Sequence, residues 1–472
     1  MKTLLIRFGQ FSIGSLGAAV LNLILIPVTT YFLTPEEYGK TSMFILAQTL
    51  LIYIVYLGYD QAFTREFYEY NNKKRLLFQA MLIPLLFSII LILGMCFFAE
   101  SLSTWLFADP MYTHAIYLLA ISSVLLIFER FILLFVRMEN KAIRFSLYSI
   151  IIKLAILLGT VCALLIGPAT FITVIYGMLI GQMIGDFILI IMNLTLFTGY
   201  KGSLDRQLIK RLTLFGVPVV VGTFLYSLFI VIDKLFLRYF SDFNEIGIYT
   251  AAFKIASALM VLQVSFSNFW IPTAYEWYQQ KKPILYYKKV SDAVMFSTAL
   301  FFLVMLFFKE WIVLFILSPA YSEAQYVFPF LCFYPIMMTV SETTNLGIVF
   351  LKKSIFNIFV SASALIVAIA LNFMLVPTYG AIGASISTGT AYIVFFFART
   401  YFSMRIWEGF SVKRHLFVTG LLYSLALWSI VFHQDSIEKL VILLSIILLV
   451  FLYKKEISYL WNLKTRKERK NK

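Results

Sequence analysis

We select ten charged side chains inside long apolar segments of the sequence as the residues best placed to do chemistry. The five basic ones are Arg130, Lys153, Lys234, Arg238 and Lys254, and the five acidic ones are Asp60, Glu129, Asp186, Asp233 and Glu342. A charge in lipid hydrocarbon costs roughly 3 kcal/mol or more, so such a residue normally faces a cavity or a charged partner. Cations in a cavity can hold a phosphate-type anion, and carboxylates can bind a proton or a sodium ion.

Lys153 and Arg130 are the two basic residues that an anion arriving from the cytoplasm would meet first. They lie six to eight residues, or roughly 9 to 12 Å, inside the ends of their segments that the charge pattern assigns to the cytoplasm. Lys153 has no acidic residue at i±3 or i±4, so we predict that it lines a cavity and contacts the anion. Arg130 follows Glu129 directly, and it either joins that site or extends to water at the interface.

The other basic residues lie nearer the opposite side of the membrane. Asp233 and Lys254 have similar depths on consecutive antiparallel segments, which predicts an ion pair between them. Lys234 and Arg238 are four residues apart and share one helix face.

The remaining acids are open to two interpretations. Asp186 and Glu342 either bind a coupling proton or sodium ion or serve as counter-charges of neighbouring basic residues, and the near-equal numbers of acids and bases favour counter-charges. Asp60 lies closer to the interface. Tyr53, Tyr56 and Tyr59 recur every third residue, which predicts a stripe on one helix face that either stacks on sugar rings or packs at the interface.

The composition identifies the environment of these residues. Of 472 residues, 61% are hydrophobic and 13% are charged, and the mean hydropathy is +0.88. These values are typical of an integral membrane protein. The net charge of +15 lies in short loops between apolar segments, so it does not indicate nucleic-acid binding. The three cysteines and three histidines are far apart in the sequence, and we predict neither a metal site nor a cofactor.

Apolar segments of bilayer-spanning length recur along the whole chain, and we count about fourteen. They are 11–33, 39–64, 76–98, 114–136, 145–166, 171–197, 212–240, 246–272, 290–317, 326–351, 355–376, 381–402, 415–432 and 439–453. Lysine and arginine concentrate at the N-terminus, in alternate loops and in the tail from Lys454, which places both termini in the cytoplasm. The first segment follows a short basic stretch without a cleavage site, which favours an uncleaved first span.

The second half of the chain repeats features of the first half. Tyr31-Phe32, Glu37 and Tyr38-Gly39 correspond to Tyr239-Phe240, Glu245 and Ile246-Gly247 about 208 residues later. Six spans separate the copies, so the halves have the same orientation and are related by an axis along the membrane normal. We predict an all-α membrane protein with two six-helix lobes, 1–206 and 207–405, and a C-terminal helix pair with a basic tail in 406–472.

Four sequence motifs occur in order along the second half. They are Ile232-Asp233-Lys234, the segment 244–254 (NEIGIYTAAFK), the segment 317–321 (LSPAY), and Asn372 followed by the segment 376–384 (VPTYGAIGA). With these motifs the chain resembles the Wzx-type oligosaccharide flippases, which share the MOP superfamily with MATE multidrug exporters and lipid II flippases. The resemblance covers essentially the whole chain.

The resemblance implies a MATE-like fold and alternating access by two lobes around a cationic cavity. It also implies a substrate, an oligosaccharide repeat unit linked to undecaprenyl pyrophosphate, which moves from the inner to the outer leaflet of the bacterial cytoplasmic membrane. The product would be capsule, O-antigen lipopolysaccharide or a related surface polysaccharide. The expected partners are membrane lipids, a coupling proton or sodium ion, and the polysaccharide polymerase machinery.

Two other function classes remain to be weighed against the flippase. A MATE-type multidrug exporter is expected to have an acidic cavity, and the thirteenth and fourteenth spans would be unexplained. A membrane glycosyltransferase or polymerase is expected to have a large extracytoplasmic loop with catalytic residues, and every loop here is short. No Ser-His-Asp set or phosphate-binding glycine loop is evident, so we predict a transporter and not an enzyme.

Overall fold

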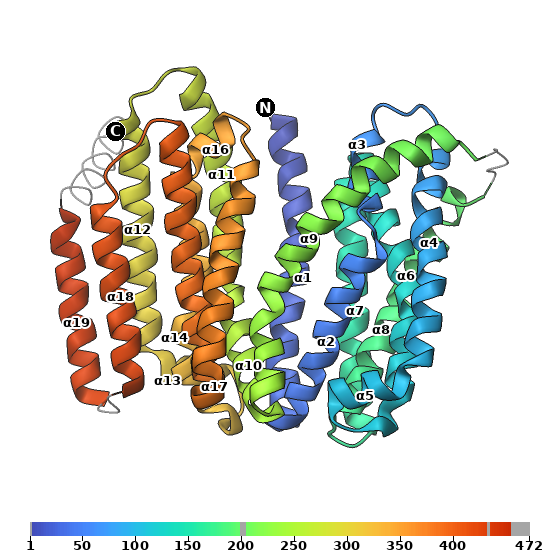
Figure 1. The fold of residues 1–472 in the computed structure, drawn as a ribbon, viewed down its shortest axis with the longest axis horizontal. Coiled ribbons are helices and arrows are strands. Elements are labelled where there is room, and N and C mark those ends of the chain that lie inside the picture. Colours follow the sequence, from blue (N-terminus) through green and yellow to red (C-terminus); the bar gives the residue numbers. More distant parts are fainter. Residues whose placement is uncertain (1, 199–203, 432–434, 455–472) are drawn as a thin grey trace, which may run out of the picture. The chain divides into compact units, whose positions relative to one another are not determined.

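The computed structural model describes residues 2–198, 204–431 and 435–454. All regular structure in these ranges is helical (Figure 1). The helices of the first half are α1 (Lys2–Phe32), α2 (Pro35–Val55), α3 (Tyr59–Glu66), α4 (Lys73–Phe97), α5 (Ala99–Phe107), α6 (Thr113–Met138), α7 (Ala142–Ile166), α8 (Phe171–Met192) and α9 (Arg206–Phe240). Those of the second half are α10 (Phe243–Ala258), α11 (Met260–Gln279), α12 (Ile284–Phe307), α13 (Lys309–Ile316), α14 (Ala324–Leu331), α15 (Phe333–Thr344), α16 (Leu346–Phe350), α17 (Ile355–Ile406), α18 (Lys413–Val431) and α19 (Asp435–Leu452).

These helices group into the fourteen predicted spans once the breaks within spans are recognised. Single residues separate α10 from α11 and α14 from α15, so each set continues one span. The opposite case is α17, which is non-helical at Gly380 (φ 48°). Ser387 Oγ in α17 donates to the Ala368 carbonyl oxygen at 3.0 Å, so the two parts of α17 lie side by side as two antiparallel spans. The prediction of about fourteen transmembrane helices is therefore confirmed.

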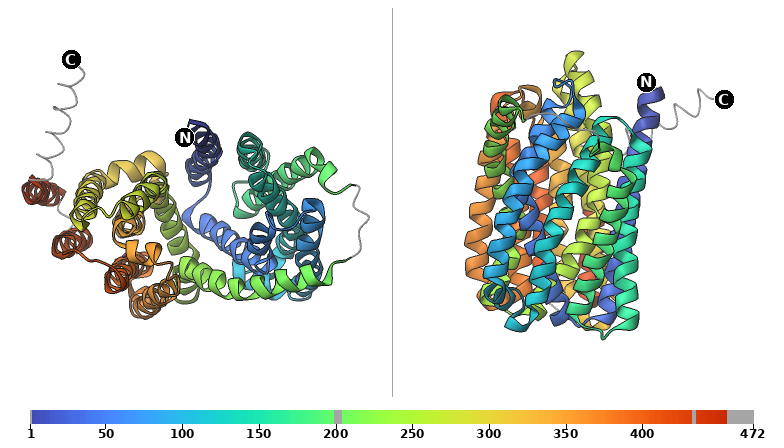
Figure 2. Two further views of the ribbon diagram at one scale, coloured as in Figure 1. Left: turned by 90° about the horizontal axis from the view of Figure 1, so that it is seen from above. Right: turned by 90° about the vertical axis from the view of Figure 1, so that its right-hand side faces the viewer.

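The chain divides into two compact units, and most of α9 belongs to the first. Unit 1 comprises residues 1–234 and 242–247, and unit 2 comprises 235–241 and 248–472. In each unit the long helices run roughly along one common direction (Figure 2). The division falls later than the predicted boundary at residue 206, and the predicted lobes 1–206, 207–405 and 406–472 stay a prediction. Lys201, His433 and the basic tail from 455 lie outside the described residues.

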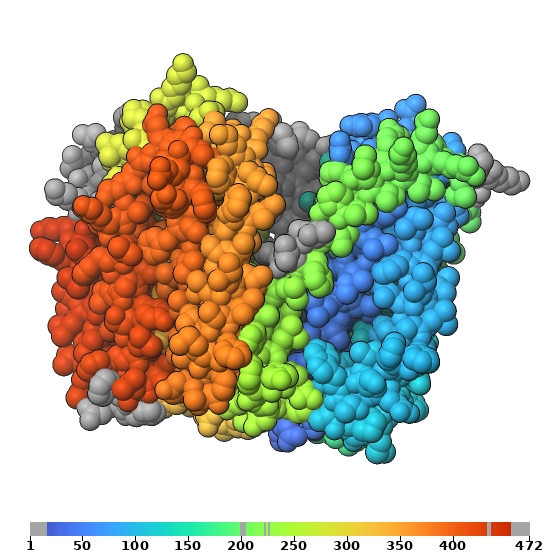
Figure 3. Space-filling view, viewed as in Figure 1, coloured from blue at the N-terminus to red at the C-terminus, as the bar shows by residue number. Residues whose placement is uncertain are grey.

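Large apolar side chains cover the outward faces of the long helices. On α4, exposed residues recur on one face: Leu86, Ile89, Ile90, Leu93 and Phe97 have 53 to 83% of their surface exposed, and α4 lies open in the space-filling view (Figure 3). Ten of the described helical stretches are long and apolar enough to cross a membrane. Exposure of a contiguous apolar surface of this extent to water is unfavourable, so these helix faces require lipid.

A close contact within unit 1 joins the two copies of the internal repeat. A Cβ atom added at Gly39 would lie 1.8 Å from the Phe243 carbonyl oxygen, and one added at Gly247 would lie 1.9 Å from the Pro35 carbonyl oxygen. The two contacts are equivalent, because Pro35 and Gly39 correspond to Phe243 and Gly247 in the repeat. Glycine at both positions lets the two backbones touch.

We expect Gly39→Ala and Gly247→Ala each to destabilise the protein strongly. The added methyl group overlaps a backbone carbonyl oxygen, which cannot rotate away, so the two segments must separate at a cost of about 1–3 kcal/mol or more. Gly94→Ala is the matched control, because nothing lies within 4 Å of the added Cβ atom. Fluorescence-detected size-exclusion after heating should show a lower midpoint for the first two variants only. Equal midpoints for all three would contradict the contact.

The C-terminal helices pack on unit 2 through α12 and α14. A buried ion pair also holds α19, since Lys309 Nζ lies 2.7 Å from Glu438 Oε1, and the two side chains are 5% and 8% exposed. The Lys309 ammonium group also lies 3.4 Å from the Ser429 carbonyl oxygen of α18. Lys309 therefore connects both C-terminal helices to the start of α13.

Removing one partner of this pair should loosen α19. Lys309→Met leaves the Glu438 carboxylate buried without its counter-charge, a change that typically costs about 3–5 kcal/mol. Protease cleavage between α18 and α19 should therefore become faster. The double variant Lys309→Met, Glu438→Gln should regain most of the resistance, and additive losses would argue against the pair.

Candidate functional site

Charged residues from four helical segments of unit 1 converge on one region, which we call the polar cluster. Its members share burial or half-burial within the bundle; they are Tyr56, Asp60, Glu129, Arg130, Lys153 and Asp186.

Lys153 lies eleven residues after Ala142, the start of α7, or about 16 Å along the helix axis. Arg130 lies eight residues before Met138, the end of α6, or about 12 Å. Both are deeper in their helices than predicted, because the helices extend beyond the apolar segments.

A break in the second span positions Asp60 in the polar cluster. Helix α2 ends at Val55, and α3 starts at Tyr59. Between them, Leu57 has a φ of 47° and Gly58 a φ of 69°. A Cβ atom at Gly58 would lie 2.4 Å from the Gly216 carbonyl oxygen of α9, so the break fits only with glycine against this backbone. Irregular backbone at membrane depth is tolerated where it is buried in protein or lines a cavity.

The same break overturns the predicted tyrosine stripe. The hydroxyl of Tyr56 donates to the Leu126 carbonyl oxygen of α6 at 3.1 Å, whereas the hydroxyl of Tyr59 lies 2.6 Å from Thr213 Oγ1 of α9. The two tyrosine side chains therefore contact different helices, α6 and α9. Their spacing in the sequence presumed one continuous helix, and the structure interrupts that helix between them.

Arg130 and Asp60 form an ion pair within the polar cluster. Arg130 donates to Asp60 Oδ2 from Nη2 at 2.7 Å and from Nε at 3.1 Å. The Arg130 guanidinium also lies 5.7 Å from the centroid of the Tyr56 ring. Asp60 is 6% exposed, whereas the Arg130 side chain keeps 38% of its surface exposed. Arg130 is therefore paired with Asp60 and also partly exposed, and the two sequence-based alternatives for it stay predictions.

Small residues bring α7 and α8 close together beside the polar cluster. Added Cβ atoms at Gly177 and Gly181 of α8 would lie 2.7 Å and 2.4 Å from the carbonyl oxygens of Gly159 and Ala155. Such spacing of small residues is typical of tightly packed membrane helices. The close approach places Asp186 of α8, which is 1% exposed, within electrostatic range of Lys153 on α7.

Lys153 therefore has an acidic neighbour, although none lies on its own helix. Asp186 is affected by two charged side chains, the like charge of Glu129 and the opposite charge of Lys153. The absence of an acidic residue at i±3 or i±4 therefore does not leave Lys153 without a nearby acid, because Asp186 comes from the neighbouring helix α8. The predicted role of Lys153 as an anion ligand is not tested by this geometry and stays a prediction.

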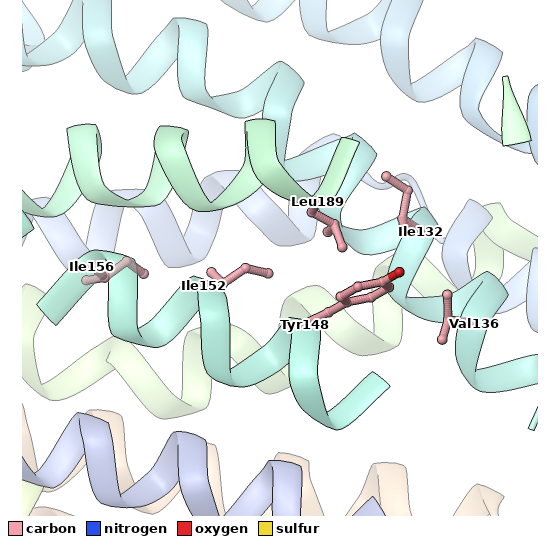
Figure 4. Close-up of a cluster of buried hydrophobic side chains, with 6 residues drawn as sticks. All are labelled: Ile132, Val136, Tyr148, Ile152, Ile156 and Leu189. Atoms are coloured by element: carbon pink, nitrogen blue, oxygen red, sulfur yellow. The ribbon is translucent and has the colours of Figure 1, made fainter. Parts of the chain in front are cut away.

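An apolar layer borders the polar cluster on the α6, α7 and α8 side (Figure 4). Its buried members are Ile132, Val136, Tyr148, Ile152, Ile156 and Leu189. Three of them, Ile132, Ile152 and Leu189, lie one to three residues from Arg130, Lys153 and Asp186. The layer lowers the local dielectric, which strengthens interactions among the nearby charges and makes an unbalanced charge costly.

The formal charges of the polar cluster do not cancel. Asp60 and Arg130 neutralise each other, which leaves two carboxylates, Glu129 and Asp186, for the single cation Lys153. Fully ionised, the set carries one negative charge in excess. Binding of one proton or one monovalent cation would balance it.

Unit 2 has a further ion pair, between the buried Glu342 of α15 and the half-buried Arg399 of α17. Arg399 Nη1 lies 3.2 Å from Glu342 Oε1 and 2.9 Å from Ser341 Oγ. The Glu342 backbone carbonyl accepts a hydrogen bond from Trp270 Nε1 at 3.0 Å. Glu342 is thus held as a counter-charge within the packing of three spans.

The remaining predicted residues are divided between the two units. Asp233 is buried and Lys234, Arg238 and Lys254 are half-buried; each takes part in further interactions. Asp233 and Lys234 belong to unit 1, whereas Arg238 and Lys254 belong to unit 2. The predicted pair of Asp233 with Lys254 stays a prediction.

Three charged residues of unit 2, two of them buried and one half-buried, were not predicted from the sequence. Arg399 lies within segment 381–402, and Lys309 and Asp292 lie within segment 290–317; each has an ionic partner in the structure. The rule applied to the other segments, that a charge in an apolar run marks a partner or a site, would have found all three. In the described part of the chain no cluster of three His, Cys, Asp or Glu residues is placed to hold a metal ion.

Comparison with known proteins connects this architecture to a family. The family model described as "Polysaccharide biosynthesis protein" matches residues 8–277, more than half of the 472-residue chain. The chain belongs to the polysaccharide biosynthesis protein family. A search of curated proteins found no match. The matched range includes all of the polar cluster.

Solved structures show which fold this member of the polysaccharide biosynthesis protein family adopts. The lipid II flippase MurJ in an inward closed conformation superposes with a TM-score of 0.72 over 95% of this chain and 99% of that chain, at 16% identity. A MATE protein in complex with MaD3S gives a TM-score of 0.57 over 85% and 95% of the two chains, at 15% identity. An inward-facing multidrug resistance MATE family transporter of the MOP superfamily gives 0.57 over 84% and 94%, at 14% identity. The predicted MATE-like fold is therefore confirmed.

Proposed function

We propose that this family member is a flippase that moves oligosaccharides linked to undecaprenyl pyrophosphate from the inner to the outer leaflet, by alternating access. The observation that carries the proposal is the half-buried Lys153 beside Asp186 in a protein of the polysaccharide biosynthesis family. A deeply placed ammonium group can bind the pyrophosphate, an anion that lipid rejects. The polyprenyl tail stays in the bilayer throughout.

The charge imbalance of the polar cluster suggests how substrate and ion binding are linked. With Glu129 and Asp186 both ionised, Lys153 is fully compensated and has little affinity for a further anion. When one proton or sodium ion binds to the two carboxyls, the net charge of the polar cluster becomes zero. The incoming pyrophosphate is then no longer repelled by two negative charges at Glu129 and Asp186. The ion and the anionic substrate then favour each other's binding, which is the coupling that transport requires.

The other three basic residues are assigned a later contact with the substrate. Lys234, Arg238 and Lys254 lie nearer the side that the charge pattern places outside the cell, so they would receive the pyrophosphate after Lys153 releases it. The Arg130–Asp60 and Arg399–Glu342 pairs keep a structural role, since each guanidinium is already satisfied by a carboxylate.

We further propose that the protein resides in the bacterial cytoplasmic membrane with both termini inside, and that it works with a polysaccharide polymerase. In a background lacking Cys96, Cys162 and Cys332, single cysteines at Asp109 and Asp242 should react with an impermeant thiol reagent on intact cells. A cysteine at Lys73 or Lys281 should react only after permeabilisation. The reverse pattern at any of these positions would contradict the orientation.

Deletion of the gene tests the function itself. The cells should accumulate undecaprenyl-linked repeat units in the cytoplasmic leaflet and lose the corresponding surface polysaccharide, whether O-antigen or capsule. Restoration by the wild-type gene is the control. Normal surface polysaccharide in the deletion strain, with no accumulated intermediate, would contradict the proposal.

A second function is favoured by one observation, the excess of acidic over basic residues in the polar cluster. An ion-coupled exporter of organic cations would use Glu129 and Asp186 to bind its substrate. The deletion strain would then become sensitive to cationic drugs and keep its surface polysaccharide, so the same strain distinguishes the two functions.

A further inference from the structure

Unit 2 contains a long apolar cavity that none of the ion pairs or the substrate contacts above uses. It has a volume of about 1080 Å³ and is lined by residues of α11, α12 and α15 together with Leu259. The α12 lining runs from Tyr286 to Phe301, fifteen positions that correspond to about 22 Å of helix. A single leaflet has about 15 Å of hydrocarbon, so the cavity spans the depth of one leaflet and extends somewhat beyond it.

The wall of this cavity offers almost nothing to a polar ligand. Two of its hydroxyls are satisfied by their own helices: Thr298 Oγ1 donates to the Val294 carbonyl oxygen at 2.8 Å, and Thr339 Oγ1 donates to the Pro335 carbonyl oxygen at 2.6 Å. A sugar or a drug with several donors would lose its hydrogen bonds to water here without replacement. A hydrocarbon chain loses nothing.

One end of the cavity has the composition of a membrane interface. Lys289 is the one charged residue among the described residues that line it, and Trp277 and Tyr286 lie at the same end. Two ammonium groups lie near the Tyr286 ring, Lys282 Nζ at 5.9 Å and Lys289 Nζ at 6.0 Å from its centroid. The Trp277 ring lies 6.0 Å from the Tyr286 ring. Tryptophan, tyrosine and lysine residues are typical of the headgroup level of a membrane. The positive charge of the loop between α11 and α12 places this end of the cavity on the cytoplasmic side.

We propose that this cavity binds an anionic glycerophospholipid of the cytoplasmic leaflet. An acyl chain fills the apolar part along α12, and the phosphate lies at Lys289 and Lys282 beside the Tyr286 ring. Basic pockets between membrane helices on the cytoplasmic side bind anionic headgroups in this manner. We assign a phospholipid and not the transported lipid, because an acyl chain fits within the length of the cavity whereas an extended undecaprenyl chain is longer than the cavity.

Lipid retention by the purified full-length protein tests the proposal. Native mass spectrometry would follow titration with palmitoyl-oleoyl phosphatidylglycerol, and separately with phosphatidylcholine that carries the same chains. We expect one phosphatidylglycerol to be retained in preference to phosphatidylcholine. Lys289→Gln should weaken phosphatidylglycerol binding about fivefold and leave phosphatidylcholine unchanged, since a juxtamembrane lysine acts on anionic lipids alone.

A second pair of variants tests the acyl-chain site. Ser297→Phe places a ring in the middle of the cavity lining and should reduce retention of both lipids. Its control is Val304→Phe, a lipid-facing change on the same helix outside the lining. The control for Lys289→Gln is Lys353→Gln, which removes an exposed charge from a different loop.

Three results would overturn the assignment. The first is equal retention of the two lipids by the wild-type protein, and the second is a Ser297→Phe variant that behaves like Val304→Phe. The third is displacement of phosphatidylglycerol by undecaprenyl phosphate at lower concentration than by free phosphatidylglycerol, which would make the cavity part of the transport route. None of these readouts requires transport, so the result does not depend on the proposed function.

Discussion

Replacing Lys153 with alanine is expected to abolish export of the surface polysaccharide while leaving the amount of protein in the membrane unchanged. The variant removes the ammonium group proposed to bind the pyrophosphate, and it leaves Glu129 and Asp186 to share a proton instead. Lys153→Arg should restore part of the export, because it keeps the charge but changes the geometry of the contact. The measurement is the amount of surface polysaccharide per cell at matched protein level.

Lys141 provides the matched control for this variant. It follows the end of α6, its Nζ lies 2.6 Å from Glu139 Oε2, and its side chain is 44% exposed. Lys141→Ala should leave export unchanged, since an exposed pair contributes little. Normal export by Lys153→Ala would refute the assignment. Loss of the protein itself in Lys153→Ala would show that Lys153 serves mainly to neutralise Asp186.

Breaking the Arg130–Asp60 pair is expected to lower the stability of unit 1 by at most about 3 kcal/mol, below the usual range for buried pairs, because the Arg130 side chain is 38% exposed. Arg130→Gln leaves the Asp60 carboxylate without its counter-charge beside the helix break at Leu57 and Gly58. The neutral double variant Arg130→Gln, Asp60→Asn should recover much of the loss. The measurement is the thermal midpoint in detergent, followed by size-exclusion.

The outcome of this cycle distinguishes a structural pair from an anion site. If Arg130 bound the substrate, the neutral double variant would regain its stability but would not regain export. If the pair is structural, as we propose, both properties should return together. Equal, additive losses in the two single variants would show that the two residues do not interact.

Hydrophobic length and loop charge are global properties, and for this reason they predicted the spans well. A stretch such as 114–136 has only one way to satisfy its backbone in lipid. The breaks within spans were not predictable in the same way. Gly58 allows the second span to break only because Gly216, more than 150 residues away, presents its backbone at that point, and no local pattern records such a contact.

The residues of the polar cluster could be predicted from single apolar segments, but their partners could not. Charges within apolar segments identified all five of its ionisable members, yet their partners depend on which helices are neighbours. Asp186 faces Lys153 because Gly181 and Ala155 let α7 and α8 approach closely, and Asp60 reaches Arg130 because α3 starts anew after the break. These pairings are properties of packing, so the sequence indicated the residues but not their partners.

Transport by the purified protein is the most direct test of the account. The protein would be reconstituted into vesicles with an undecaprenyl-pyrophosphate oligosaccharide carrying a fluorescent sugar label, and a reagent added outside would destroy the label on exposed sugar. We expect protein-dependent loss of the inner-leaflet signal, accelerated by a proton or sodium gradient and absent in Lys153→Ala. An inner-leaflet signal that decays equally with and without the protein, under either gradient, would contradict it.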